Sequence, residues 1–134
     1  MTTDYRSAVQ EAVAGALGLG EDEVTPDATL MDDLGAESID LLDILFRIER
    51  STGVKISASD LGDEMQGGIP EDDFGTPEGN VSRRGLEYLH DVVMPQLDPD
   101  EWDGKLQAEE VINHFTVQNL ADMVGRRAGQ QQPA

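Results

Sequence analysis

The sequence predicts an all-α protein, because apolar residues recur at helical spacing in several stretches and glycines follow the first two. Between Tyr5 and Leu17 an apolar side chain comes at every fourth position, and residues 38–52 again follow an i, i+3, i+4 pattern. Gly18 and Gly53 stand directly after these stretches, where glycine is favoured because it accepts the left-handed conformation that ends many helices. We therefore expect two amphipathic helices in the first half of the chain.

Residues 18–37 are expected to form a long ordered loop between these helices. Polar and turn-forming residues dominate the segment, and Pro26 and Gly35 mark its bends. It also contains four apolar residues at intervals that could attach it to a core, namely Val24, Leu30, Met31 and Leu34.

The second helix is expected to begin at about Ser38 and to end at Thr52. Its apolar positions suggest one buried stripe, formed by residues 39, 42, 45, 46 and 48. Ser38 then lies at the N-terminal edge of the helix, where the first N–H groups lack intrahelical acceptors and the peptide dipoles favour negative charge. This position suits a phosphate ester on the serine hydroxyl.

The middle of the chain divides into two parts of different character. Residues 60–80 are acidic and rich in glycine and proline, so we expect a mobile loop there, held at a few apolar positions, Met65, Ile69 and Phe74. Residues 82–97 instead carry apolar side chains at helical spacing, although Pro95 predicts an early end or a kink.

Two further helices and the last helix are expected after residue 97. Asp98 followed by Pro99 is typical of a cap and first helical turn, and residues 107–115 could form a short helix that buries Val111, Ile112 and Phe115. Thr116 is a suitable N-cap for a closing helix whose stripe contains Val117, Leu120 and Val124. The polar tail from 127 to 134 is expected to be disordered.

Composition excludes several classes of function. The 134 residues suffice for one domain, and 28 acidic against 9 basic residues give a formal charge of −19, which argues against binding to nucleic acid or anionic membranes. Without cysteine the chain has no disulfides, thiolate metal sites or cysteine nucleophile. We expect no membrane insertion and a cytoplasmic location, because no stretch approaches the ~20 apolar residues of a membrane span and the N-terminus shows no targeting pattern.

The stretch Asp33-Leu34-Gly35-Ala36-Glu37-Ser38-Ile39-Asp40 resembles the prosthetic-group attachment motif of acyl carrier proteins, usually D-L-G-x-D-S-L-D. Glu37 stands in place of aspartate and Ile39 in place of leucine. The preceding loop has the length usual in that family, and the segment that begins Thr116-Val117 is similar to its T-V-x-D-L closing helix, with Asn119 in place of aspartate. The resemblance covers residues 5–56 continuously.

The resemblance implies a fold and a division of the chain. The fold is an acyl-carrier-like four-helix bundle with extra inserted helices between the second and the last helix. The whole chain, 1–134, is then a single carrier domain with a core of 3–57 and 114–126, an insertion of 58–113 and the tail of 127–134. We expect a monomer.

The resemblance also implies a cofactor, partners and site residues. Ser38 would carry 4'-phosphopantetheine, taken from coenzyme A by a phosphopantetheinyl transferase, and its thiol would hold an acyl chain for acyl-processing enzymes of the ketosynthase, acyltransferase and acyl ligase types. The chain itself would not be an enzyme. The implied docking residues are acidic, namely Asp33, Glu37, Asp40 and Asp43. The implied acyl pocket is apolar and contains Ile39, Leu42, Phe46, Ile56 and Val117.

The pathway stays open between fatty-acid or specialised lipid biosynthesis and a polyketide or other secondary-metabolite pathway. The insertion resembles, as a class, the specialised carriers that serve very-long-chain lipid A acylation. Its apolar residues could enlarge or cover an acyl cavity, or the inserted helices could form a docking surface for one dedicated partner.

The sequence also contains residues that superficially suit other kinds of site. The segment 98–109 fails as a calcium loop because its fifth position is Trp102 and its glycine falls at seven instead of six. His90 and His114 would need a third ligand to hold a metal, so we expect no metal site. A hydrolase with Ser38 as nucleophile lacks the second glycine of the G-x-S-x-G turn, and a non-carrier acidic interaction module remains the alternative.

Overall fold

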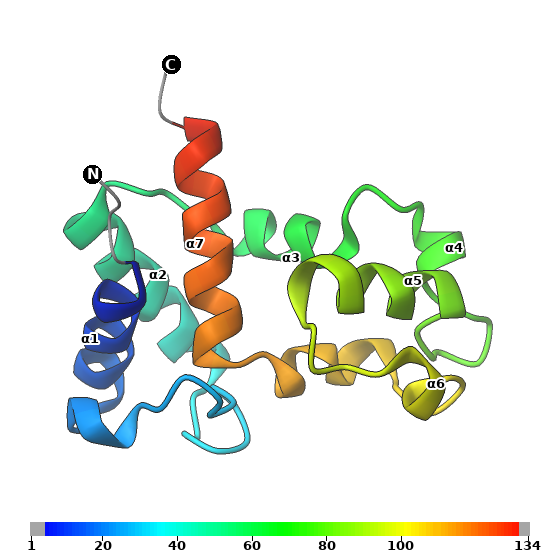
Figure 1. Cartoon of the computed structure of the whole chain (residues 1–134), viewed down its shortest axis with the longest axis horizontal. Helices are drawn as coiled ribbons and strands as arrows, with labels where there is room; N and C mark the ends of the chain where they lie inside the picture. The colour runs from blue at the N-terminus through cyan, green and yellow to red at the C-terminus, as the bar shows by residue number, and fades with distance from the viewer. Residues whose placement is uncertain (1–4, 132–134) are drawn as a thin grey trace. The chain divides into compact units, whose positions relative to one another are not determined.

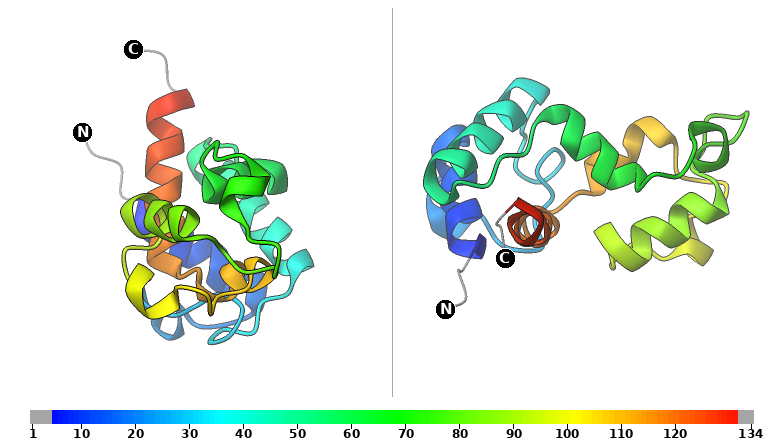
Figure 2. Two further views of the ribbon diagram at one scale, coloured as in Figure 1. Left: turned by 90° about the vertical axis from the view of Figure 1, so that its right-hand side faces the viewer. Right: turned by 90° about the horizontal axis from the view of Figure 1, so that it is seen from above.

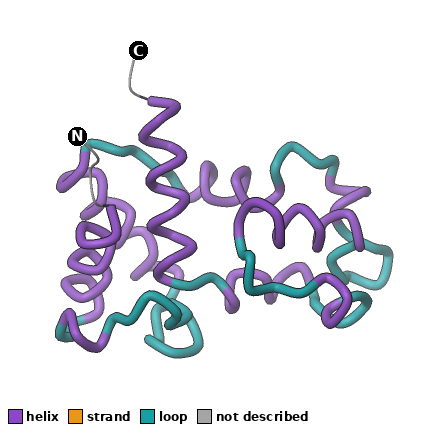
Figure 3. The backbone as a smooth tube through the Cα atoms, viewed as in Figure 1, coloured by secondary structure: helices purple, strands orange, loops and turns teal. Residues whose placement is uncertain are grey.

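The computed structural model of the chain describes residues 5–131 and confirms the all-α class. Within these residues the chain forms helices and loops without a strand (Figure 3), and only three isolated β-bridges join extended residues. No helix in this part of the chain is both long enough and apolar enough to cross a membrane.

The chain divides into two compact units. The first, here the terminal unit, combines Met1–Ala58 with Asn113–Ala134, and the second, here the inserted unit, is Ser59–Ile112. The boundaries of the inserted unit lie within one residue of the insertion expected at 58–113.

Three long helices build the terminal unit: α1 (Tyr5–Leu17), α2 (Ser38–Thr52) and α7 (Val117–Gln131). A short 3-10 turn, η1 (Glu21–Glu23), lies in the loop between α1 and α2. Helix α1 packs against both α2 and α7 (Figures 1 and 2), which gives the unit a core of aliphatic side chains. The core includes Val9, Val13, Ile44, Ile48, Leu120 and Val124, all fully buried.

The expected bounds of the first two helices agree with the structure, whereas the last helix extends further than expected. Helix α7 continues to Gln131 instead of ending near 126. Ala128 is only 4% exposed, so packing holds the added turn in place although its sequence is polar. Residues 132–134 of the expected disordered tail lie outside the described residues.

The inserted unit consists of short helices. They are α3 (Ala58–Gln66), α4 (Glu71–Phe74), α5 (Arg83–Tyr88), the π-helical turn η2 (Leu89–Val93), α6 (Pro99–Trp102) and the 3-10 helix η3 (Ala108–His114), which runs past the unit's end at Ile112. Helix α5 packs against α4 and α6. A core of its own is formed by Leu61, Val81, Leu86, Leu89, Met94, Leu97 and Leu106.

The expectation of a mobile loop over 60–80 is wrong, because α3 and α4 occupy much of this segment. Leu61 and Ile69 are 4% and 8% exposed, so the segment is held by burial of these side chains. The two glycines that suggested a loop, Gly67 and Gly68, lie after the end of α3, where both adopt positive φ. The glycine-rich composition therefore marks the turn between two helices.

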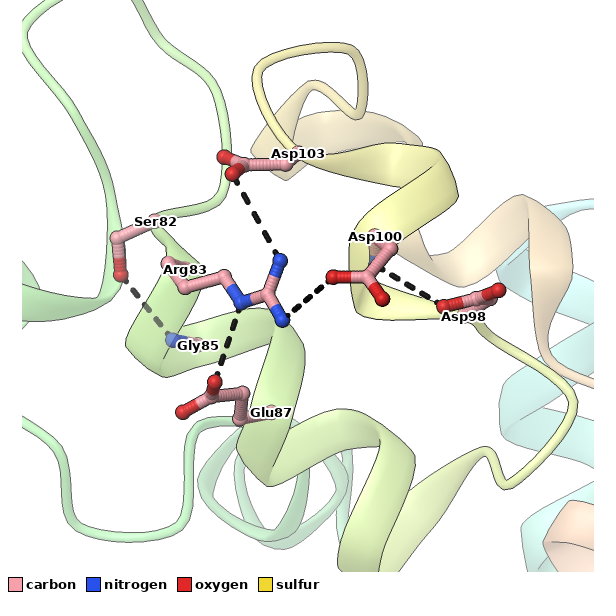
Figure 4. Close-up of polar contacts among 7 residues, drawn as sticks. All are labelled: Ser82, Arg83, Gly85, Glu87, Asp98, Asp100 and Asp103. Atoms are coloured by element: carbon pink, nitrogen blue, oxygen red, sulfur yellow. Dashed lines mark hydrogen bonds and ion pairs between the residues drawn. The ribbon is translucent and has the colours of Figure 1, made fainter.

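Capping and an ion-pair cluster hold α5 against α6. As expected, Asp98 caps α6 by accepting a hydrogen bond from Asp100 N–H at 3.0 Å, with Pro99 in the first turn. The Arg83 guanidinium meets Glu87 at 3.1 Å, Asp100 at 2.7 Å and Asp103 at 3.8 Å (Figure 4). The hydrogen bonds that the Arg83 guanidinium donates to the Asp100 and Glu87 carboxylates raise the pKa of Arg83. The helical segment expected over 82–97 ends at Val93, before Pro95.

Candidate functional site

Ser38 is the first residue of α2 and lies on the surface of the terminal unit. Glu37 precedes it as the N-cap, with the extended backbone angles φ −107° and ψ 172°. Within residues 5–131 no hydrogen-bond partner is found for the Ser38 hydroxyl. The hydroxyl is therefore accessible and is not used to cap the helix.

Backbone hydrogen bonds hold the loop that leads to Ser38 against the start of α7. Leu30 N–H donates to Phe115 C=O at 3.0 Å, and Val117 N–H donates to Ala28 C=O at 3.0 Å. Closer to the site, Ala36 N–H donates to Leu30 C=O at 2.9 Å. Leu30, Ala28 and Ala36 are buried as well. The expected attachment of this loop to the core is thus present, and it fixes the approach of the chain to α2.

The N-terminus of α2 favours a negatively charged group. Asp40 accepts a hydrogen bond from Glu37 N–H at 2.9 Å, which satisfies one donor just before the helix. The N–H groups of Ser38 and Ile39 belong to the first turn, where backbone donors lack intrahelical acceptors and face the positive end of the helix dipole. An exposed hydroxyl next to free donors fits a phosphodiester on Ser38.

The four acidic residues expected to dock partners lie in or before the first two turns of α2, and they also take part in local structure, beginning with the capping box that Glu37 forms with Asp40. Asp33 and Thr29 exchange two hydrogen bonds, each of 2.9 Å, between their side chains and backbone N–H groups. Asp40 accepts the Glu37 bond, and Asp43 pairs with Arg47 at 3.3 Å. Glu37 and Asp33 are exposed. These carboxylates therefore contribute to local structure as well as to surface charge.

The five residues expected at an acyl pocket differ widely in burial. Ile56 and Val117 are in the core, 4% and 1% exposed, whereas Ile39, Leu42 and Phe46 are 71%, 53% and 56% exposed. The expected burial of 39, 42 and 46 is wrong, whereas that of Leu45 and Ile48 is confirmed, because α2 turns Leu41, Ile44, Leu45 and Ile48 inward. The acyl pocket stays a prediction, and the face of α2 below Ser38 is an exposed apolar strip.

Two arginine contacts at the far end of α2 were missed by the sequence analysis. Arg50 lies over the Phe46 ring, 5.6 Å from its centroid, and so covers one end of the apolar strip with a positive charge. Arg47 pairs with Asp43 and lies against Gly15 of α1, where a Cβ would come within 2.7 Å of its Nη1 atom. The i, i+4 spacing of both pairs was the signal that could have revealed these contacts.

No metal centre accompanies this site in the part of the chain that the structure describes. Among residues 5–131 no group of three or more histidine, aspartate or glutamate side chains could hold a metal ion.

Comparison with known proteins matches the region that contains this site. A family model described as a phosphopantetheine attachment site matches residues 7–66. The acyl carrier protein of Thermotoga maritima is 44% identical over 55 residues, which cover 41% of this chain and 68% of that protein. The acyl carrier protein of Solidesulfovibrio magneticus is 44% identical over 52 residues, covering 39% of this chain and 67% of that protein.

A relative with a more specific name is similar over a slightly longer segment. The acyl carrier protein AcpXL of Brucella melitensis is 33% identical over 67 residues, which cover 49% of this chain and 72% of that protein. No solved structure matches the chain.

Proposed function

The chain belongs to the acyl carrier protein family, and on this premise we propose that Ser38 is the residue that carries its phosphopantetheine and that the protein serves fatty-acid or specialised lipid synthesis. Phosphopantetheine is the prosthetic group of the family, and the protein is a carrier rather than an enzyme. It works with a phosphopantetheinyl transferase and with acyl-processing enzymes.

One observation carries the assignment to Ser38: its exposed hydroxyl, without a hydrogen-bond partner among residues 5–131, is the first side chain of α2. The loop bonded to the start of α7 holds this residue in place, and the first-turn N–H groups stabilise the phosphate charge. When bound, the group supplies a thiol that holds an acyl chain as a thioester. The protein's own contribution is to present that group on a rigid helix start.

The attachment site is tested by mass spectrometry of the intact protein after incubation with coenzyme A and a phosphopantetheinyl transferase. The unchanged chain should gain the mass of one phosphopantetheine, and Ser38→Ala should gain none. Ser51→Ala is the matched control, because Ser51 is an exposed serine on the same helix, and it should be modified fully. Modification of the Ser38→Ala protein would contradict the proposal.

We propose further that partners dock on the α2 face next to Ser38. The acids Asp33, Glu37, Asp40 and Asp43 surround the start of the helix, and the exposed side chains of Ile39, Leu42 and Phe46 follow it. Arg50 and Arg47 make the far end of this face basic, so the fitting partner surface has an apolar centre, a basic side near Ser38 and an acidic side near Arg50. This mixed pattern favours dedicated partners and therefore a specialised lipid pathway. A cytoplasmic location belongs to the same proposal.

A further inference from the structure

The inserted unit contains an open groove formed by two adjoining hollows, here the α3–α4 groove. The larger hollow has a volume of about 610 Å³, and the smaller has a volume of about 220 Å³. Gln66, Phe74 and Ala108 line both hollows, so the two are continuous. All the lining residues belong to the inserted unit, which makes the groove a property of that unit alone.

The groove has an apolar floor and an acidic rim. Met65, Phe74 and Ile112 present partly exposed apolar surface to it, beside the buried Val111. Glu71 and Asp72 stand at the edge of the larger hollow and Glu109 at the edge of the smaller, and all three are exposed. Among residues 5–131, no lysine or arginine lines either hollow.

The inserted unit carries most of the chain's negative charge. Residues 59–112 hold fifteen acidic and three basic residues, so this unit carries −12 of the chain's −19. Two of the three basic residues are already committed, because Arg83 is held by Glu87, Asp100 and Asp103 (Figure 4) and Arg84 pairs with Asp73 at 3.2 Å. The groove therefore faces solvent with a strong negative potential.

We propose that the α3–α4 groove docks an amphipathic basic helix of a partner protein. Such a helix would place apolar side chains on Phe74, Met65 and Ile112, and lysine or arginine side chains against Glu71, Asp72 and Glu109. An acyl chain fits less well, because the carboxylates of Glu71, Asp72 and Glu109 line the same hollows and would lose hydration without a partner. The proposal goes beyond the modification of Ser38 and gives the inserted unit a function of its own.

The test adds a synthetic helical peptide of leucine and lysine, with one apolar stripe, to the ¹⁵N-labelled 134-residue chain that carries phosphopantetheine. Amide shifts should change within 62–79 and 108–112. A control peptide with serine in place of leucine keeps the charge but lacks the apolar stripe, and one with glutamate in place of lysine keeps the stripe but lacks the positive charge. Both should bind much more weakly than the leucine and lysine peptide. The mass of each sample reports Ser38 modification separately, and the unmodified protein should bind the peptide equally.

Two variants locate the binding. Glu71→Gln with Glu109→Gln should weaken binding about tenfold, whereas Asp91→Asn with Glu101→Gln removes the same charge from exposed acids outside the groove and should have little effect. Ala108→Arg adds bulk and positive charge where the hollows meet and should abolish binding, with the circular dichroism spectrum unchanged.

Four outcomes would overturn the proposal. Peptide-induced shifts confined to residues 38–46 would assign the site to the exposed apolar face of α2. If the two double variants weaken binding equally, or if the serine-substituted peptide binds as well as the leucine peptide, the interaction depends on net charge alone. Finally, the protein can be loaded with a long acyl chain. If this shifts the amides of the groove and the acylated protein no longer binds the peptide, the groove binds the acyl chain instead.

Discussion

At the scale of single residues, Gly53 determines where α2 ends. Its φ is +78°, and its N–H donates to Glu49 C=O at 2.8 Å, so it closes the last turn in a left-handed conformation. A Cβ added there would meet no atom within 4 Å, which leaves backbone strain as the main cost of a substitution.

Gly53→Ala should therefore lower the free energy of unfolding by about 1 kcal/mol, because alanine tolerates the left-handed region poorly. Gly129→Ala is the control: Gly129 lies within α7 and has equal space, so alanine should raise stability by up to about 1 kcal/mol through its higher helix propensity. Urea unfolding measures both, and equal effects of the two changes would contradict the assignment of strain to Gly53.

Single residues also show how far the sequence could predict the site. Ser38 at the start of a helix followed from local signals, namely a turn-forming stretch and an apolar pattern behind it. The burial of Ile39, Leu42 and Phe46 was predicted wrongly, because α2 has two apolar sets that both fit a 3.6-residue period. Packing against α1 decides which set is buried, and the spacing of apolar residues along a single helix carries no information about that packing.

At the scale of elements, the α2 face combines acids near Ser38 with an apolar strip and two arginines. Glu37 is the exposed acid next to Ser38, while Asp40 accepts a hydrogen bond from Glu37 N–H and Asp43 pairs with Arg47. A partner's basic side chain can therefore reach Glu37 from solvent.

Glu37→Gln should accordingly lower kcat/KM for modification by a phosphopantetheinyl transferase about threefold at low ionic strength, with a smaller effect in high salt. Glu11→Gln removes the same charge from an exposed position on α1 and should leave the rate nearly unchanged. Intact-protein mass spectrometry over time gives both rates. If the two variants slow modification equally, net charge rather than local docking controls the encounter.

The helices of the inserted unit show why element prediction failed in the middle of the chain. Glycine and acidic residues over 60–80 predicted a loop, yet α3 and α4 form there because Leu61 and Ile69 are buried in the unit's core. Short helices depend on such tertiary packing more than on propensity. By contrast, Asp98 with Pro99 correctly predicted the start of α6, because a cap acts through neighbouring residues alone.

At the scale of the whole molecule, the two compact units each have their own core. The terminal unit is built on α1, α2 and α7, and the inserted unit on residues 59–112. Since each unit buries its own aliphatic side chains, we expect the inserted unit to open without unfolding the helix that bears Ser38.

Gly67→Ala tests this expectation within the inserted unit. Gly67 has φ +65°, and an added Cβ would overlap with the Tyr88 ring and hydroxyl. Tyr88, whose hydroxyl donates to Glu64 C=O at 2.7 Å, would have to move and lose that bond. The lost hydrogen bond and the backbone strain should together destabilise the inserted unit by roughly 2 kcal/mol.

Gly68→Ala separates the two causes, because Gly68 also has a positive φ of +79° but no atom within 4 Å of an added Cβ. It should cost only the strain, about 1 kcal/mol. Amide hydrogen exchange reports each unit separately: in Gly67→Ala protection should fall across 59–112 and persist in α1, α2 and α7, with Ser38 modified at the unchanged rate. Equal loss of protection in α2 would mean that the two units unfold as one, so that the insertion supports the carrier helices directly.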